Sequence, residues 1–253
     1  MLRRDFLDQL ELASPALASN DLVPILTHFG FTGSEVLAYN DQIGMSLPLK
    51  TQFKGAVPGG TLIDLLRASK AKEVELAEKS SELEIKAASS RFKLPVMGNG
   101  QFVFEMPEPS GKVLPVNLGH FADAVEACLM SVLSSDLSVP DYLGVTMIAD
   151  GDALLLFSTN NATLSTSELP LTGKCPFKGR VILPALFCQQ VLKLVGSFKG
   201  LKLEVNADYA LLSVEDGVRC FGRFVNSPKP KDFIKMADAH LSGAAKKLRP
   251  IPS

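Results

Sequence analysis

The 253-residue sequence repeats one order of predicted secondary-structure elements. Each half begins with a helix, over Phe6–Ala16 and over Phe121–Leu133, in which apolar residues recur at helical spacing. Each half continues with a proline-led strand, over Pro24–Leu26 and over Pro140–Met147, and then with a hairpin. A repeat on this scale predicts that the chain is built from two copies of one fold.

The two halves correspond most closely just before a second predicted helix. Phe53-Lys54-Gly55-Ala56-Val57 stands against Phe177-Lys178-Gly179-Arg180-Val181, and a proline follows shortly after each segment. Proline suits a first helical turn because its missing N–H would be unpaired there in any case. We therefore predict second helices over Leu62–Ala68 and Leu186–Val195, with further strands after each.

The repeat and a turn-rich stretch between its copies define the predicted domains. We predict a first domain over residues 1–108, a connector over 109–116, a second domain over 117–228 and a basic C-terminal tail over 229–253. Each domain is expected to hold two helices on antiparallel strands, so the predicted fold class is α+β. A short helix is expected in the tail.

The composition limits the classes of function. The 26 basic and 27 acidic residues balance, so any affinity for DNA must come from charge placed on one face. The spacing of the cysteines fits neither a zinc site nor a compact disulfide framework, which indicates reduced thiols in a cytoplasmic protein. The four are Cys128, Cys175, Cys188 and Cys220. No stretch approaches the roughly 18 apolar residues of a membrane span.

The motifs of catalytic, metal and cofactor sites are lacking. His28 has no acidic or thiol neighbour, and His120 and His240 each have one nearby aspartate, which is too little for a metal site. Asp150-Gly151-Asp152 is better explained as a turn than as a calcium loop, and Gly98-Asn99-Gly100 is too short to cradle a phosphate. We expect no enzymatic activity, no cofactor and no metal.

The repeat, with a Val-then-Pro start to each second helix and a Ser-x-x-Phe-x-Leu-Pro strand closing the first half, resembles the bacterial DNA polymerase III beta clamp of the DNA sliding clamp family. The resemblance is closest over these segments: Phe6–Leu26, Ala56–Ser69, Ser89–Pro95, Gly144–Leu171 and Val181–Val195. Rings of this family contain six such domains, which implies a homotrimer of this two-domain chain. Two domains per chain is the arrangement of archaeal, eukaryotic and some bacteriophage clamps, and it suggests a bacteriophage or another mobile replicon as the source.

The resemblance implies a function. A sliding clamp is a processivity factor without enzymatic activity that encircles duplex DNA independently of sequence and tethers the replicative polymerase. Its partners would be duplex DNA, DNA polymerase, a clamp loader and further copies of itself. Two alternatives stay open: a clamp-like decoy or interaction protein that binds polymerase or loader without encircling DNA, and an enzyme on an unrelated two-lobed fold.

The resemblance also implies DNA-facing residues, because the helices of such domains line the hole of the ring. Arg67 and Lys193 occupy equivalent places in the two second helices and are the first candidates. The further candidates are Arg3, Arg4, Lys70, Lys72 and Lys199. Asp123 and Glu126 in the first helix of the second half predict an inner surface less positive than is usual.

A pocket for short linear motifs of partner proteins is the second implied site, on the second domain beside Ser158–Leu164. The pocket residues that the resemblance implies are Thr159, Leu164, Pro230, Tyr142, Ile234 and Met236. A His-Arg pair in the family pattern is replaced here by Ala162-Thr163, a departure that argues against binding of the motif usual for the family.

Overall fold

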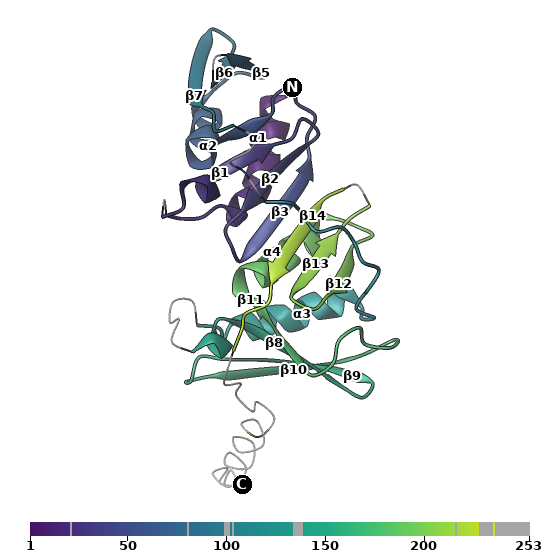
Figure 1. The fold of residues 1–253 in the computed structure, drawn as a ribbon. Coiled ribbons are helices and arrows are strands. Elements are labelled where there is room, and N and C mark those ends of the chain that lie inside the picture. The colour runs from purple at the N-terminus through teal and green to yellow at the C-terminus, as the bar shows by residue number, and fades with distance from the viewer. Residues whose placement is uncertain are drawn as a thin grey trace, which may run out of the picture. The chain divides into compact units, whose positions relative to one another are not determined.

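A computed structural model describes most of the chain. The described residues are 1–20, 22–79, 81–98, 102, 104–133, 139–215, 217–227 and 235. The described residues pack into two units (Figure 1): unit 1 combines Met1–Val113 with Ser197–Arg223, and unit 2 combines Leu114–Gly196 with the described residues from Phe224 onward. The domain boundaries expected from the repeat stay a prediction, since a packing unit and a repeated sequence need not share their ends.

Unit 1 is built around a seven-stranded antiparallel sheet with the strand order β12-β13-β14-β3-β2-β1-β4. Its strands are β1 (His28–Phe31), β2 (Glu35–Tyr39), β3 (Ile43–Pro48), β4 (Gly55–Pro58), β12 (Lys202–Val205), β13 (Tyr209–Ser213) and β14 (Arg219–Arg223). Strand β14 joins β3 in a register that pairs Cys220 with Met45. The sheet therefore unites strands from both halves of the sequence.

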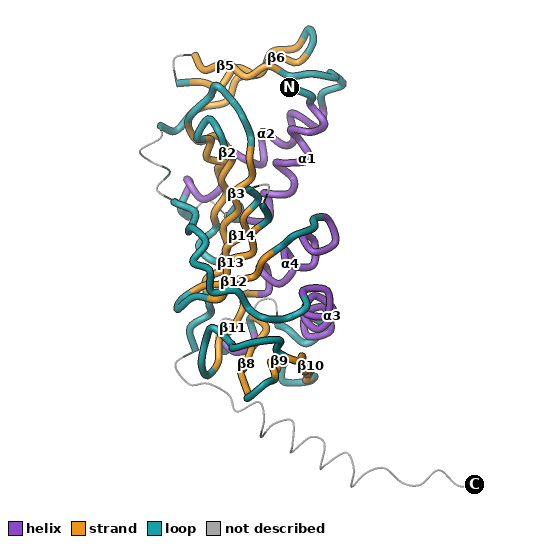
Figure 2. The backbone as a smooth tube through the Cα atoms, turned by 90° about the vertical axis from the view of Figure 1, so that its right-hand side faces the viewer, coloured by secondary structure: helices purple, strands orange, loops and turns teal. Residues whose placement is uncertain are grey.

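Two helices cover one face of this sheet. In Figure 2, α1 (Arg3–Ala13) and α2 (Gly59–Ala68) lie on the same side of strands β2 and β3. Phe6 of α1 and Leu66 of α2 are both buried, and the Phe6 ring lies 6.3 Å from the ring of Phe31 in β1. The apolar stripe of each helix thus faces the sheet, as an amphipathic pattern predicts.

A smaller antiparallel sheet completes unit 1. It consists, in order, of β5 (Glu75–Lys79), β6 (Glu82–Ala87) and β7 (Ser90–Pro95). Leu83 and Ile85 are buried, and between them Glu84 points to the opposite face, where Lys79 Nζ lies 2.7 Å from its Oε2. This hydrogen bond lowers the pKa of Glu84. The sheet is apolar on one face and charged on the other.

Unit 2 contains a four-stranded antiparallel sheet and two helices. Its elements are α3 (Leu118–Leu129), β8 (Gly144–Asp150), β9 (Ala153–Thr159), β10 (Leu164–Pro170), β11 (Arg180–Pro184) and α4 (Ala185–Ser197), with the strand order β10-β9-β8-β11. Helix α3 packs across β8, β9 and β10 and buries Phe121, Val125 and Cys128. The Asn117 side chain caps its N-terminus by accepting a hydrogen bond from the backbone N–H of His120.

The predicted α+β class is confirmed, with two helices in each half and antiparallel sheets in the described part of the chain. The strand predicted over Pro24–Leu26 is wrong, and the strand predicted over Pro140–Met147 is wrong at its start. Pro24–Thr27 and Pro140–Tyr142 are 3₁₀ helices, and β1 and β8 begin after them. Proline lacks the N–H that a strand ladder needs, while its fixed φ suits a helical turn.

None of the helices in the described residues combines the length and the apolar character needed to cross a membrane. The short helix predicted in the tail lies outside the described residues.

The opposite face of the large sheet is covered by a stretch without regular structure, which we call the crossing segment (residues 104–113; teal in Figure 2). Phe104 stacks on Tyr39, with ring centroids 4.3 Å apart. Gly44 in β3 makes room for this ring, because a Cβ at that position would overlap Phe104. Met106 packs into a cluster with Leu211 and Phe221. The sheet is therefore sandwiched between helices and this segment.

Packing against the crossing segment generates a prediction for Tyr39. Burial, helped by a 3.0 Å hydrogen bond to Asp41 Oδ1, raises the pKa of Tyr39 to about 12. Since the unfolded value is about 10, this group stabilises the fold below that pH, and the contribution is lost as the pH rises toward 12. We expect Tyr39→Phe to remove a step near pH 12 from the phenolate absorbance titration. A titration curve unchanged by the substitution would contradict the assignment.

Candidate DNA-facing helices and partner pocket

Arg67, the first DNA-facing candidate, lies in the last turn of α2 with 59% of its side chain exposed. Its Nε donates a 2.8 Å hydrogen bond to Glu11 Oε1 of α1, and its Nη1 lies 3.8 Å from Asp64 Oδ1. Arg67 thus ties the two helices of unit 1 together while part of its guanidinium faces solvent.

Arg3 lies at the start of α1 and binds the end of α2. Its Nε donates to the carbonyl oxygen of Ala71 at 2.9 Å, and its Nη1 donates to that of Leu66 at 2.8 Å. The last carbonyls of a helix lack partners within the helix, so a cation there satisfies them and complements the helix dipole. This geometry gives Arg3 a structural role in joining α1 to α2.

The remaining basic candidates of unit 1 are exposed. Arg4 Nε lies 3.8 Å from Asp8 Oδ2, one helical turn away in α1. Lys70 and Lys72 follow the end of α2, and Lys199 precedes β12; all three have exposed side chains. Their DNA-facing role stays a prediction.

The helices as a set are not basic. In unit 2, Lys193 is exposed on α4, but Asp123 and Glu126 are exposed on α3. The four α-helices together carry four cationic residues, Arg3, Arg4, Arg67 and Lys193, and six acidic residues, Asp5, Asp8, Glu11, Asp64, Asp123 and Glu126. Any attraction of these helices for phosphate must therefore be local.

Three of the predicted pocket residues meet at the turn between β9 and β10. Thr159 pairs with Leu164 in the strand register, and its Oγ1 donates a 2.6 Å hydrogen bond to the carbonyl oxygen of Thr163. The Tyr142 hydroxyl donates to Asn161 Oδ1 at 3.4 Å. Tyr142 and Thr159 are buried and Leu164 is half-buried. Of the three, Leu164 offers the most apolar surface to a ligand.

The rest of the predicted pocket lies outside the described residues: Pro230, Ile234 and Met236. The chain that leads toward them is fixed to unit 2 by a buried carboxylate. Asp141, which is 1% exposed, accepts hydrogen bonds from Ser227 Oγ at 2.8 Å and from Arg180 Nη2 at 2.6 Å. Asp141 directly precedes Tyr142, so one short turn both carries a predicted pocket residue and holds Ser227.

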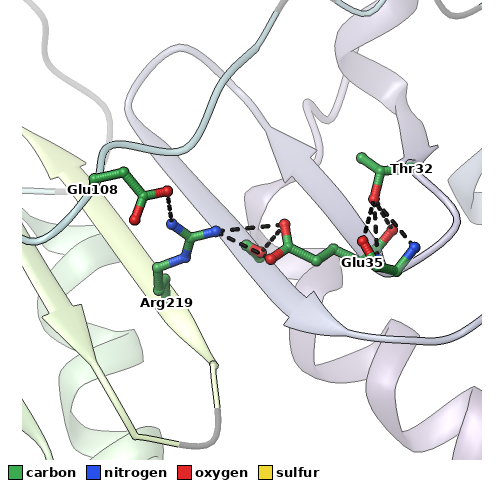
Figure 3. Close-up of polar contacts among 6 residues, drawn as sticks. Thr32, Glu35, Glu108 and Arg219 are labelled. Carbon is green, nitrogen blue, oxygen red and sulfur yellow. Dashed lines mark hydrogen bonds and ion pairs between the residues drawn. The ribbon is translucent and has the colours of Figure 1, made fainter.

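An ion-pair cluster that the sequence did not reveal lies on the sheet of unit 1 (Figure 3). Arg219 of β14, with a side chain 13% exposed, donates from Nη2 to Glu35 Oε1 of β2 at 3.1 Å and from Nη1 to Glu108 Oε1 of the crossing segment at 2.7 Å. Ser46 Oγ donates to Glu35 Oε2 at 3.0 Å. Glu35 and Glu108 are 184 and 111 positions from Arg219 in the sequence, so no local sequence pattern could have identified this cluster.

The chemistry available in the described residues is limited. No group of three or more His, Cys, Asp or Glu side chains in this part of the chain is placed to hold a metal ion. Burial raises the pKa of the Cys128 thiol to about 11 and also raises the pKa values of Cys188 and Cys220. Thiols with raised pKa values stay protonated at neutral pH and are poor nucleophiles.

Sequence comparison links the chain to sliding clamps. No protein-family model matches it. The chain is 24% identical over 230 residues to the Beta sliding clamp of Micrococcus luteus, a match that covers 86% of this chain and 73% of that relative.

Structure comparison finds the same fold in bacterial clamps. The DNA polymerase III beta subunit of Thermotoga maritima superposes with a TM-score of 0.77 at 18% identity, covering 93% of this chain and 66% of that one. The Helicobacter pylori beta clamp bound to a DNA ligase peptide gives 0.76 at 21% identity, with coverages of 92% and 67%. This chain spans about two thirds of the length of these two structures. The resemblance to the sliding clamp family is confirmed, and the α+β fold is that of the beta clamp.

The Arg219 cluster generates a stability prediction. Arg219→Met removes both ion pairs and leaves Glu35 half-buried without its cation, so we expect the free energy of unfolding in urea to fall by about 2 kcal/mol. Arg223→Met on the same strand is the matched control, because Arg223 is 56% exposed and lies 3.6 Å from Asp41. The control should change stability by less than about 0.5 kcal/mol. Equal losses in the two variants would rule out a special role for the cluster.

Proposed function

We propose that this chain, which is similar in sequence and fold to the DNA sliding clamp family, is a processivity factor that encircles duplex DNA and tethers the replicative DNA polymerase. The observation that carries the proposal is the structural match to bacterial clamps over 93% of the chain. The proposed function needs no catalysis: enclosure holds the protein on DNA, and contacts to phosphates carry no sequence information.

The proposed ring is a homotrimer. Six domains make a ring in this family, and the sequence predicts two copies of the repeated unit in this chain. Among the described residues, β5 ends the small sheet of unit 1 and β10 ends the sheet of unit 2, so these two strands are candidates for joining copies. An edge strand presents unpaired N–H and C=O groups that can pair with a strand of another chain.

The proposed partners besides DNA are the polymerase and a clamp loader in the cytoplasm of a bacterial or phage-infected cell. The Helicobacter pylori clamp binds a DNA ligase peptide. We propose that this chain takes a comparable short peptide beside Leu164, Thr159 and Tyr142, at the turn between β9 and β10. Groove-type recognition of this kind uses a few apolar anchors of an otherwise exposed peptide.

One observation favours a second candidate. The acidic excess on the four helices would suit a clamp-like protein that binds polymerase or loader without encircling DNA. Such a decoy would inhibit replication rather than support it.

Solution mass distinguishes the two candidates. The ring proposal predicts, by light scattering, a mass three times that of the 27.2 kDa chain. It also predicts that the protein, once loaded, stays on nicked circular DNA and slides off the same DNA after linearisation. A monomer at every concentration, together with no difference between circular and linear DNA, would favour the decoy.

The DNA-facing assignment predicts a loss of processivity. Arg67→Glu combined with Lys193→Glu should leave the fold intact and shorten the products of a primer-extension assay by at least about threefold, because two cationic positions on the helices become anionic and repel phosphate. Lys50→Glu combined with Lys112→Glu is the matched control, since both lysines are exposed and lie outside the helices. Wild-type product lengths in the Arg67 and Lys193 double variant would refute the assignment.

A further inference from the structure

We infer that Glu11 restrains DNA binding by the helices of unit 1, because it occupies the guanidinium of Arg67 that a phosphate would otherwise engage. The inference rests on the proposed function and names a residue that determines how tightly the protein binds DNA. In this scheme Glu11 acts through Arg67 and does not itself touch DNA.

The pair is held in place by packing. Glu11 follows the fully buried Leu10 on α1, and Arg67 follows Leu66, which is 1% exposed, on α2. The backbones that carry the two charged residues are therefore fixed by the core. The 2.8 Å contact between Glu11 Oε1 and Arg67 Nε joins two positions 56 residues apart.

Carboxylate and phosphate compete for the same groups. Both accept hydrogen bonds from the planar N–H fork of a guanidinium. A DNA phosphate must share Arg67 with Glu11 or displace it, and Asp64 Oδ1 lies only 3.8 Å from Nη1. A cation already neutralised within the protein releases few counterions from DNA, so it adds little to the affinity.

The other cations of these two helices are also occupied. Arg3 donates to the carbonyls of Leu66 and Ala71, and Arg4 lies 3.8 Å from Asp8. Helices α1 and α2 are described throughout, and each of their three arginines thus has a partner within the protein. Removing Glu11 would give this surface a cation with most of its hydrogen-bonding capacity available.

Pairing of the arginines within the protein affects how easily the protein slides along DNA. A surface whose arginines are already paired attracts phosphates weakly, so the protein moves along DNA with little resistance. Enclosure, rather than affinity, then keeps the protein on DNA. Glu11 sets this balance for unit 1.

The test measures binding of a short linear duplex by fluorescence anisotropy over a series of NaCl concentrations, because a linear duplex cannot retain a ring by topology. We expect Glu11→Gln to raise affinity about three- to tenfold at low salt and to steepen the slope of log K against log salt by about 0.9, the value of one added phosphate contact. Glu11→Ala should give the same gain if Glu11→Gln folds poorly.

Two controls isolate the pair. Glu82→Gln removes the same charge from an ion pair of the same 2.8 Å length, with Lys93 on the small sheet, and should leave the slope unchanged. The double variant Glu11→Gln with Arg67→Gln should lose the gain. An equal gain in Glu82→Gln, a gain that survives loss of Arg67, or no gain at all would each overturn the inference.

The proposed function is judged separately by wild-type protein on nicked circular and linear DNA. Equal retention on the two substrates would refute the encircling clamp, whatever Glu11 does. Preferential retention on the circle, with no effect of Glu11→Gln on the duplex, would refute only the role of Glu11.

Discussion

The pairing of β14 with β3 is the interaction on which the architecture of unit 1 depends. It aligns Cys220 with Met45 and Phe221 with Gly44, and these four residues are buried. Without this ladder the large sheet would divide into a three-stranded and a four-stranded piece. The crossing segment would also lose its support, since it packs on strands from both pieces. Much of the free energy that orders this segment therefore comes from contacts between segments far apart in the sequence.

Features that depend on neighbouring residues in the sequence could be predicted, because the spacing of apolar residues decides which face of an element is buried. The apolar stripe of α3 could be predicted because helical spacing places Phe121, Val125 and Cys128 on one face, and the structure buries all three. The segment beginning at Pro24 was misassigned because the apolar residues that follow this proline fit a short strand as well as a 3₁₀ turn. Hydrophobicity alone cannot separate these alternatives over four residues or fewer.

In the candidate sites, too, local contacts could be predicted from the sequence and contacts between distant segments could not. The residues at the turn between β9 and β10 lie close together because adjacent strands place Thr159 opposite Leu164. The partner of Arg67 was not predictable, since Glu11 reaches it only through the packing of α1 on α2. The Arg219 cluster depends in the same way on the register of β2, β3 and β14. Tertiary contacts thus decide which charges a surface can offer to a ligand.

The shared sheet also has a consequence for synthesis. A chain emerging from the ribosome exposes β3 long before β14 exists, so the growing first half carries an unpaired strand edge. Ile43, Met45 and Leu47 on that strand are buried in the folded unit. Exposed edges of this kind are where nascent chains misassociate. Folding of unit 1 can be completed only after residue 223 has been added, so the rate of synthesis of β12, β13 and β14 limits when unit 1 can finish folding.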